Sequence, residues 1–320
     1  MATEADVEQL FQSLHPRIAE IKGRDVGLRT GGNLGCLLMV LPFAAAIGIL
    51  MMLKDPTMSA ALWGWPLLVA PVIGVVVVYV GFKMWRPWAT VSGGQRAEAD
   101  SVLLPQLAAL LLPGATFTRP PITLKDYHPS LLMALMRGVT MTHSGHIEGE
   151  LLGRPLTIDE VRGSFDHNFM SSWFVRVDLP FVLAGHLIIH RRTMTTPGIF
   201  WRDGFEPLAD ESRRLGRGWH VELGPLGLGT DEGLAAPPPG AVPPGVVLTE
   251  GLFRVLRDRE DVKVAATGRT LWIVVERQIM AFDSQVPDFE DVTKWKKAAV
   301  AMLDVEAVTH EVLAAADVRG

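Results

Sequence analysis

Two long stretches without a charged residue constrain this chain more than any other feature. They cover residues 30–53 and 56–82, and only two charged residues lie between them. A helix needs about 20 mostly apolar residues to cross the hydrocarbon core of a bilayer, and both stretches are longer than that. The sequence therefore predicts a two-helix transmembrane hairpin at 30–88, with spans at about 31–53 and 60–82.

The residues around the two stretches predict an orientation. Aromatic residues that favour the lipid–water interface lie near both ends of the second stretch, at Trp63, Trp65, Tyr79, Trp85 and Trp88. Lys and Arg are more frequent before and after the hairpin than in its turn, so both termini are expected on the cytoplasmic side. Because no ionisable residue lies in the middle of either stretch, we interpret the hairpin as an anchor and not as a pore.

Glycine and alanine within the stretches predict close helix packing, and prolines within them suggest an alternative to two full spans. Ala44 and Gly48 on the first stretch, and Ala70 and Gly74 on the second, recur at a spacing that lets helices approach closely. Prolines at 42, 66 and 71 can break a helix, so a re-entrant hairpin is the alternative to two full spans.

Charge and cysteine content exclude several classes of protein. Residues 95–320 carry 23 basic and 29 acidic side chains, a net charge of −6, which disfavours nucleic acid as a partner. Cys36 is the only cysteine. An internal disulfide and a zinc site built on several cysteines of one chain are therefore excluded.

The rest of the chain predicts an amphipathic segment at 1–29 and a cytoplasmic α+β domain at 95–320. The segment has an apolar stripe from Val7 to Ile21, interrupted by Pro16, and its acidic flanks favour docking on the domain over binding to anionic lipid. Predicted helices cover 95–112, 130–137, 250–257 and 291–315. Predicted strands cover 139–150, 156–161, 172–178, 182–190 and 218–223, with a hairpin of 262–266 and 271–282. No long helix separates the strands, so the sheet should be mainly antiparallel, and the long helix should close the chain. A Gly/Pro-rich loop is expected at 224–246.

Several short motifs carry a resemblance across nearly the whole chain. They are 147–150 (Ile-Glu-Gly-Glu), 153–155 (Gly-Arg-Pro), and the closing unit from Leu252-Phe253 through 271–273 (Leu-Trp-Ile) to the terminal helix. With the N-terminal hairpin, this arrangement resembles a bacterial inner-membrane family with a cytoplasmic domain of unknown function, sometimes encoded beside LemA-like proteins. The resemblance implies membrane anchorage, an α+β domain and a LemA-like protein as a possible partner, and it assigns no catalytic residue. Residues 165–173 and the 224–246 loop depart from it.

Polar residues in the predicted strands offer weak candidates for chemistry. His143, His146 and Glu148 have the residue types of a metal site, but His143 and His146 face opposite sides of a regular strand unless Gly145 introduces a bulge. His186 and His190 share a side of their strand but lie too far apart to hold one ion. Asp159, Glu160 and Asp166 can pair as acids only if the fold brings them together.

Two further patterns have ordinary interpretations. Residues 224–229 have the glycines of a phosphate loop without the Lys-Ser/Thr that should follow. Six arginines lie between 191 and 217, interleaved with acidic residues. A mixed solvated surface is one interpretation, and contact with lipid headgroups is the other.

These observations predict a function without naming a reaction. We expect a membrane-anchored cytoplasmic interaction or scaffold protein, without cofactor, metal or catalytic site, that binds a partner protein, lipid or a second copy of itself. The alternative is a membrane-surface enzyme that acts on a lipid-linked substrate through His143, Glu148 or Asp159.

Overall fold

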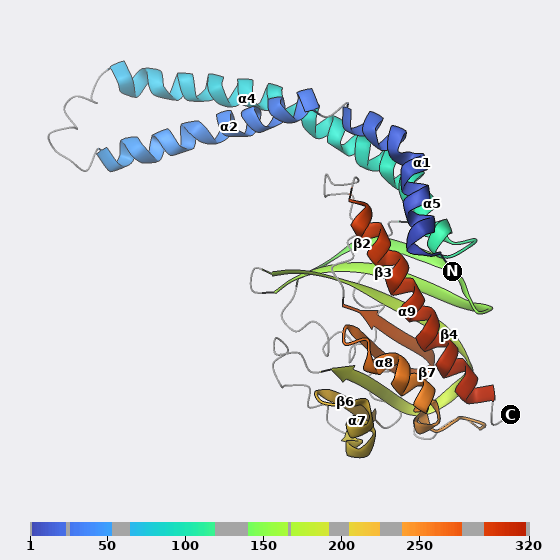
Figure 1. The fold of residues 1–320 in the computed structure, drawn as a ribbon. Helices are drawn as coiled ribbons and strands as arrows, with labels where there is room; N and C mark the ends of the chain where they lie inside the picture. The colour runs from blue at the N-terminus through green and yellow to red at the C-terminus, as the bar shows by residue number, and fades with distance from the viewer. Residues whose placement is uncertain are drawn as a thin grey trace. The chain divides into compact units, whose positions relative to one another are not determined.

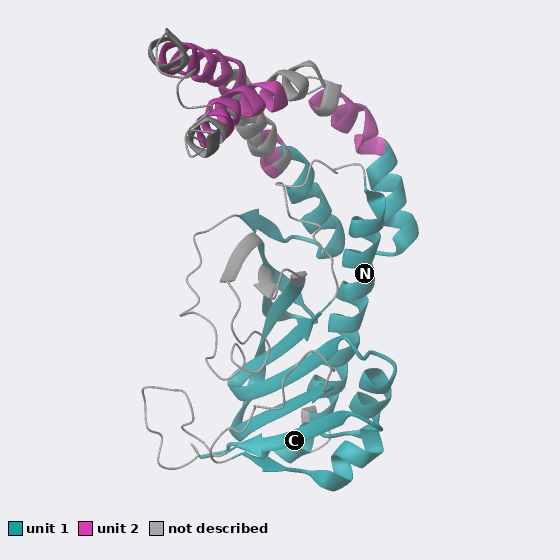
Figure 2. Cartoon of the chain, turned by 90° about the vertical axis from the view of Figure 1, so that its left-hand side faces the viewer, with its two compact units in different colours: residues 1–12, 102–320 teal, residues 13–101 magenta. Residues whose placement is uncertain are grey.

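The computed structural model of the chain consists of two compact units. It describes residues 2–23, 26–52, 65–118, 140–165, 168–191, 205–224, 239–276 and 291–317. Unit 1 comprises residues 1–12 and 102–320, and unit 2 comprises residues 13–101 (Figure 2). Helix α1 (Glu4–Gly23) and the π-helix η1 (Ala99–Leu103) each contain a boundary between the two units.

In unit 2, a pair of antiparallel helices contains most of the two charge-free stretches. These helices are α2 (Val26–Met52) and α4 (Trp65–Glu98). They approach closely at Gly35 and Gly81, where a Cβ added to either residue would lie 2.6–2.7 Å from the backbone oxygen of the other. The pair Gly74 and Pro42 lies farther along both helices, at an ordinary contact distance of 3.6 Å for an added Cβ. Close helix packing therefore occurs at Gly35 and Gly81, while the side-chain environment at Gly48 and Ala70 in the predicted spacing motifs is outside what the structure describes.

The predicted transmembrane spans need correction. A span requires a helix that is both long and apolar enough to cover the hydrocarbon core. No helix in the described part of the chain meets that requirement. The predictions of transmembrane helices at 31–53 and 60–82, and of an integral membrane protein, are therefore wrong by this criterion.

Unit 1 is an α+β structure with an antiparallel sheet, which confirms that part of the predicted fold. Its strands are β1 (Thr116–Thr118), β2 (Thr140–Leu151), β3 (Arg154–Phe165), β4 (Asn168–Arg191), β5 (Glu206–Pro207), β6 (Trp219–Gly224) and β7 (Val262–Val275). Its helices are α5 (Leu104–Leu111), α7 (Ala209–Leu215), the 3-10 helix η3 (Pro244–Val247), α8 (Glu250–Arg257) and the C-terminal α9 (Val292–Asp317). The predicted helix 130–137 lies outside the described residues.

The centre of the sheet is built by two long strands that fold back. The amide of Glu276 donates to the carbonyl of Asp261 at 2.8 Å, so the two ends of β7 lie side by side, as the predicted hairpin requires. The turn of this hairpin contains Gly268, with φ of 55°. The second arm of β7 pairs with residues 173–178 of β4, and the first arm pairs with residues 186–189 of β4. The two predicted strands 172–178 and 182–190 are thus the two halves of β4, and β7 lies between them.

Helices cover one face of this sheet. α9 packs against β4 and β7, and α8 packs against α9 (Figure 1). Alternate side chains of the strands are enclosed almost completely, among them Ile147, Leu156, Ile158, Trp173, Val175, Val177, Leu271, Ile273 and Val275. Because alternate residues of a strand point to one side, these residues form a single apolar layer, the helix-covered face.

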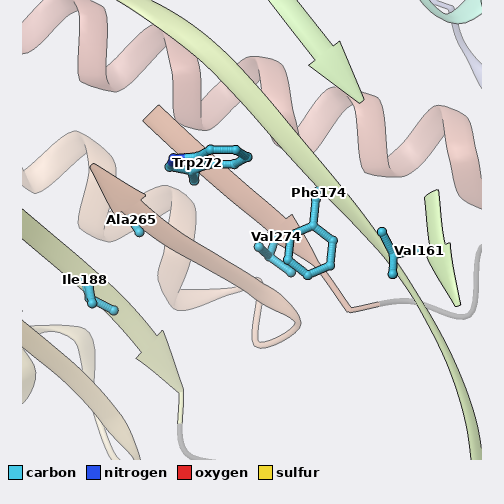
Figure 3. Close-up of a cluster of buried hydrophobic side chains, with 6 residues drawn as sticks. All are labelled: Val161, Phe174, Ile188, Ala265, Trp272 and Val274. Carbon is cyan, nitrogen blue, oxygen red and sulfur yellow. The ribbon is translucent and has the colours of Figure 1, made fainter. Parts of the chain in front are cut away.

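The opposite face of the sheet holds a smaller apolar cluster. Figure 3 shows its members, which come from β3, β4 and β7: Val161, Phe174, Ile188, Ala265, Trp272 and Val274. Phe205 packs against this cluster. Glu148, Asp159 and Arg176, from β2, β3 and β4, lie on the same face as the cluster, so this face can present polar groups to a ligand.

The start of α1 docks within unit 1, as the acidic flanks of the N-terminal segment predict. Val7 is buried, and the ring of Phe11 meets the ring of Trp295 edge to face at 5.4 Å. Nζ of Lys296 donates to Glu8 at 2.7 Å. Residues far apart in sequence are thus joined through α9.

Candidate functional site

On the opposite face of the sheet, a histidine is held between two carboxylates. The strand register places His146 of β2 directly across from Asp159 of β3. Nδ1 of His146 lies 2.6 Å from Oδ1 of Asp159, and Nε2 lies 3.0 Å from Oε1 of Glu148. The side chains of His146 and Asp159 are only 12% and 10% exposed, whereas that of Glu148 is 65% exposed.

The local backbone explains how these residues meet. The β2–β3 register shifts between His143 and Gly145, which is the bulge that Gly145 permits. Beyond the bulge the pairing is regular, and the two-residue turn at Leu152 and Gly153 fixes it. Since a slip of one residue would turn every side chain to the other face, this turn determines that His146 meets Asp159.

This arrangement favours a protonated imidazole. The hydrogen bond with Asp159 raises the pKa of His146 above its ordinary value, with a smaller contribution from Glu148, and burial opposes both only in part. A histidine with both ring nitrogens engaged by carboxylates has no free lone pair for a metal ion or for proton abstraction. The described residues contain no cluster of His, Cys, Asp and Glu suited to a metal ion.

The structure does not gather all the predicted acids and histidines. Glu160 faces the helix-covered side, where its carboxylate accepts a hydrogen bond from Nε1 of Trp173 at 3.0 Å. His143 lies on β2 before the bulge, and its side chain is outside what the structure describes. Asp166 lies outside the described residues. Among the candidates whose side chains the structure describes, His146, Glu148 and Asp159 come together.

His186 and His190 occupy separate environments, as their spacing predicts. His186 is buried, and its ring lies 6.1 Å from that of Phe205. His190 stacks on His220 of β6, with the ring centres 5.3 Å apart, and its Nε2 is 3.7 Å from Glu222. These contacts join β4 to its neighbours and do not form a ligand set.

The basic concentration between 191 and 217 consists largely of ion pairs. Arg191 pairs with Glu260, Arg213 with Asp210, and Arg214 with Glu250. This arrangement agrees with a mixed solvated surface. Arg192 and Arg202, and residues 225–229 of the glycine-rich stretch, lie outside the described residues.

Sequence reasoning missed a different group of arginines. Arg154, Arg176 and Arg269 line a hollow of about 380 Å³ at one end of the sheet. They are distant in sequence, and no motif connects them. The only available signal was that Arg154 and Arg269 each follow a glycine in a predicted turn.

Comparison with known proteins yields no relative from which a role can be transferred. No known family, curated protein or solved structure matches the chain. The resemblance to the bacterial membrane family therefore stays a prediction, and the function must be argued from the molecule itself.

Proposed function

We propose that this chain is a non-enzymatic interaction protein that associates with lipid through α2 and α4 and uses unit 1 to bind a partner. The proposal requires apolar contact with lipid and does not require either helix to cross a bilayer. By resemblance, we place it at the cytoplasmic face of the inner membrane, with both termini cytoplasmic and a LemA-like protein or a second copy of the chain as candidate partners.

The exposed apolar surface of unit 2 is the observation that carries the proposal. Large apolar side chains on both helices stand in solvent: Leu34, Leu37, Val40, Leu41, Phe43, Ile47, Val72, Ile73, Val75, Val76, Tyr79, Val80 and Phe82. Proteins that stay monomeric in water rarely expose contiguous apolar patches larger than a few hundred Å². The exposed apolar side chains of α2 and α4 therefore require an apolar environment. Lipid acyl chains can surround a helix pair whose apolar side chains point outward on several sides.

Vesicle flotation of the purified full chain tests the lipid contact. The chain should float with vesicles of phosphatidylcholine, a lipid without net charge. Phe43 and Val75 are 68% and 69% exposed. Since full burial of such a side chain contributes about 1.5–3 kcal/mol, Phe43→Ser and Val75→Ser should each weaken vesicle binding about tenfold.

The matched control is Leu303→Ser, because Leu303 is a 41% exposed apolar residue on α9 in unit 1. This variant should bind vesicles like the unchanged chain. Absence of flotation, or equal binding by all three variants, would reject lipid association.

Purification from detergent should also recover a stoichiometric partner or a homo-oligomer, and a lone monomer would reject the interaction role.

The alternative function is a membrane-surface enzyme acting on a lipid-linked substrate, and the grouping of His146, Glu148 and Asp159 is the observation in its favour. In that case the protonated His146 would act as the general acid. His146→Gln should then abolish turnover without loss of vesicle binding. A variant that retains full activity would remove His146 from the mechanism.

A further inference from the structure

The hollow at one end of the sheet lies where two turns and a bend meet. Its wall includes Arg154, Arg176, Asp178, Leu179, Arg269 and Thr270, and its volume is about 380 Å³. That volume lies within the range typical of small-molecule sites. The hollow belongs entirely to unit 1.

Backbone geometry fixes the positions of the three arginines. Arg154 is the first residue of β3 after the turn in which Leu152 and Gly153 both have positive φ. Arg269 follows Gly268 in the turn of β7. Arg176 comes from β4, which leaves its regular pairing with β7 just after Asp178. Breaks in regular strand pairing often lie beside binding sites, because they can turn side chains toward a common point that a regular strand would not bring together.

The charges in the hollow are unbalanced. Among the described residues that line the hollow, Arg154, Arg176 and Arg269 face one carboxylate, that of Asp178. Nη2 of Arg176 lies 3.7 Å from that carboxylate, which is longer than a hydrogen bond. Arg154 and Arg269 have no ion-pair partner among the described residues, in contrast to the paired arginines around 191–214. The hollow therefore presents a net positive charge of about two to a ligand.

We propose that this hollow binds a phosphate ester, either as a soluble molecule or as a lipid headgroup. A guanidinium presents planar pairs of N–H donors that match phosphate oxygens, and three of them compensate a dianion. The carboxylate of Asp178 is positioned at the same wall to accept a hydrogen bond from a hydroxyl of the esterified alcohol. Arg176 is 48% exposed, so the donors remain accessible to a ligand from solvent. This inference does not rest on the proposed function, because it concerns unit 1 alone.

Calorimetric titration of the full chain with inorganic phosphate and with glycerol phosphate tests the site. Charge-assisted hydrogen bonds are strong enough that Arg154→Gln and Arg269→Gln should each weaken binding about ten- to hundredfold. Arg217→Gln is the matched control, because Arg217 is an exposed arginine in the turn before β6, away from the hollow. It should bind both probes like the unchanged chain.

A gain-of-function variant guards against misfolding as an explanation. Asp178→Asn removes the one negative charge among the described residues of the hollow and should tighten the binding of inorganic phosphate. Circular dichroism of each ligand-free variant should match that of the unchanged chain. Absence of binding to both probes, or an equal loss in Arg154→Gln and Arg217→Gln, would overturn the proposal.

Vesicles separate the two sources of phosphate. Phosphatidylcholine vesicles with and without phosphatidic acid should differ in affinity for the chain if the ligand is a headgroup, and Arg269→Gln should remove that difference. If only soluble phosphate esters bind, the two vesicles should behave alike, and the same variant should lose glycerol phosphate. If the chain binds the phosphate probes but does not bind phosphatidylcholine vesicles, the lipid role of α2 and α4 is rejected and the arginine site is retained.

Discussion

Alanine substitutions in α4 can test whether the close contact between Gly35 and Gly81 stabilises the helix pair. Two positions are compared, so that the steric overlap of an added Cβ is separated from the gain in helix propensity. An alanine at position 81 would place its Cβ 2.7 Å from the carbonyl oxygen of Gly35 and 3.0 Å from Cβ of Leu38. An alanine at position 74, on the same helix, would meet only Cβ of Pro42 at 3.6 Å. The two positions are seven residues apart and therefore lie on one side of α4, two turns from each other.

Both substitutions improve the helix propensity of α4 by the same amount, about 0.8–1 kcal/mol. Only Gly81→Ala also forces the helices apart, because its close neighbour is backbone and cannot turn aside. Overpacking of this kind costs about 1–3 kcal/mol. The difference between the two variants is therefore about 1–3 kcal/mol, which corresponds to about a five- to hundredfold difference in the opening equilibrium of the helix pair.

Amide hydrogen exchange of α2 and α4 peptides measures that opening. The full chain in mild detergent should exchange faster in Gly81→Ala and more slowly in Gly74→Ala than without a substitution. Equal protection in the two variants would refute the reasoning, and so would stronger protection in Gly81→Ala. Gly35→Ala should resemble Gly81→Ala, since its Cβ would lie 2.6 Å from the Gly81 carbonyl oxygen.

Two further predictions concern unit 1. Because the hydrogen bond with Asp159 raises the pKa of His146, its stabilising effect is complete below about pH 6.5 and is lost as the pH rises through the folded-state pKa. Thermal unfolding from about pH 5.5 to about pH 8.5 should show this loss of stability. Asp159→Asn should flatten the dependence of the unfolding temperature on pH, and an unchanged pH profile in that variant would contradict the role of this hydrogen bond. Leu152 has φ of 52° and is 45% exposed, so Leu152→Asn should raise stability by about 0.5–1 kcal/mol. A urea midpoint lower than that of the unchanged chain would show that the leucine packing contributes more than the backbone strain costs.

Local patterns predicted the elements of unit 1 well. The alternation of apolar residues placed β2, β3 and β6 within a few residues of their observed bounds, and Thr249 caps α8 where the predicted helix 250–257 begins. Composition could not predict that β7 lies between the two halves of β4, because pairing partners distant in sequence leave no local signal. The hydropathy of 31–53 and 60–82 indicated apolar helices, and a pair of helices is what the structure contains, but the inference from apolar stretch to membrane span is the step that was wrong.

The candidate sites were less predictable for the same reason. The rise per residue along a strand correctly separated His186 from His190, since that distance depends on one strand only. The contact between His146 and Asp159 depends on the register across a turn, and the arginine hollow depends on three segments at once. Neither can be derived from spacing within one segment. The arginines also looked unremarkable individually, because an exposed arginine is ordinary until its neighbours fail to neutralise it.

The position of β7 between the halves of β4 has a consequence for the order of folding. During synthesis β4 is complete about 70 residues before the first arm of β7, at a typical rate of several residues per second. Until β7 arrives, the halves of β4 have unpaired inner edges, and such edges are templates for pairing with other chains. The central pairing is also long-range, which slows the closing step. Premature termination between residues 191 and 262 would therefore release a chain in which both halves of β4 keep an open edge, so the last fifth of the sequence protects the sheet against aggregation.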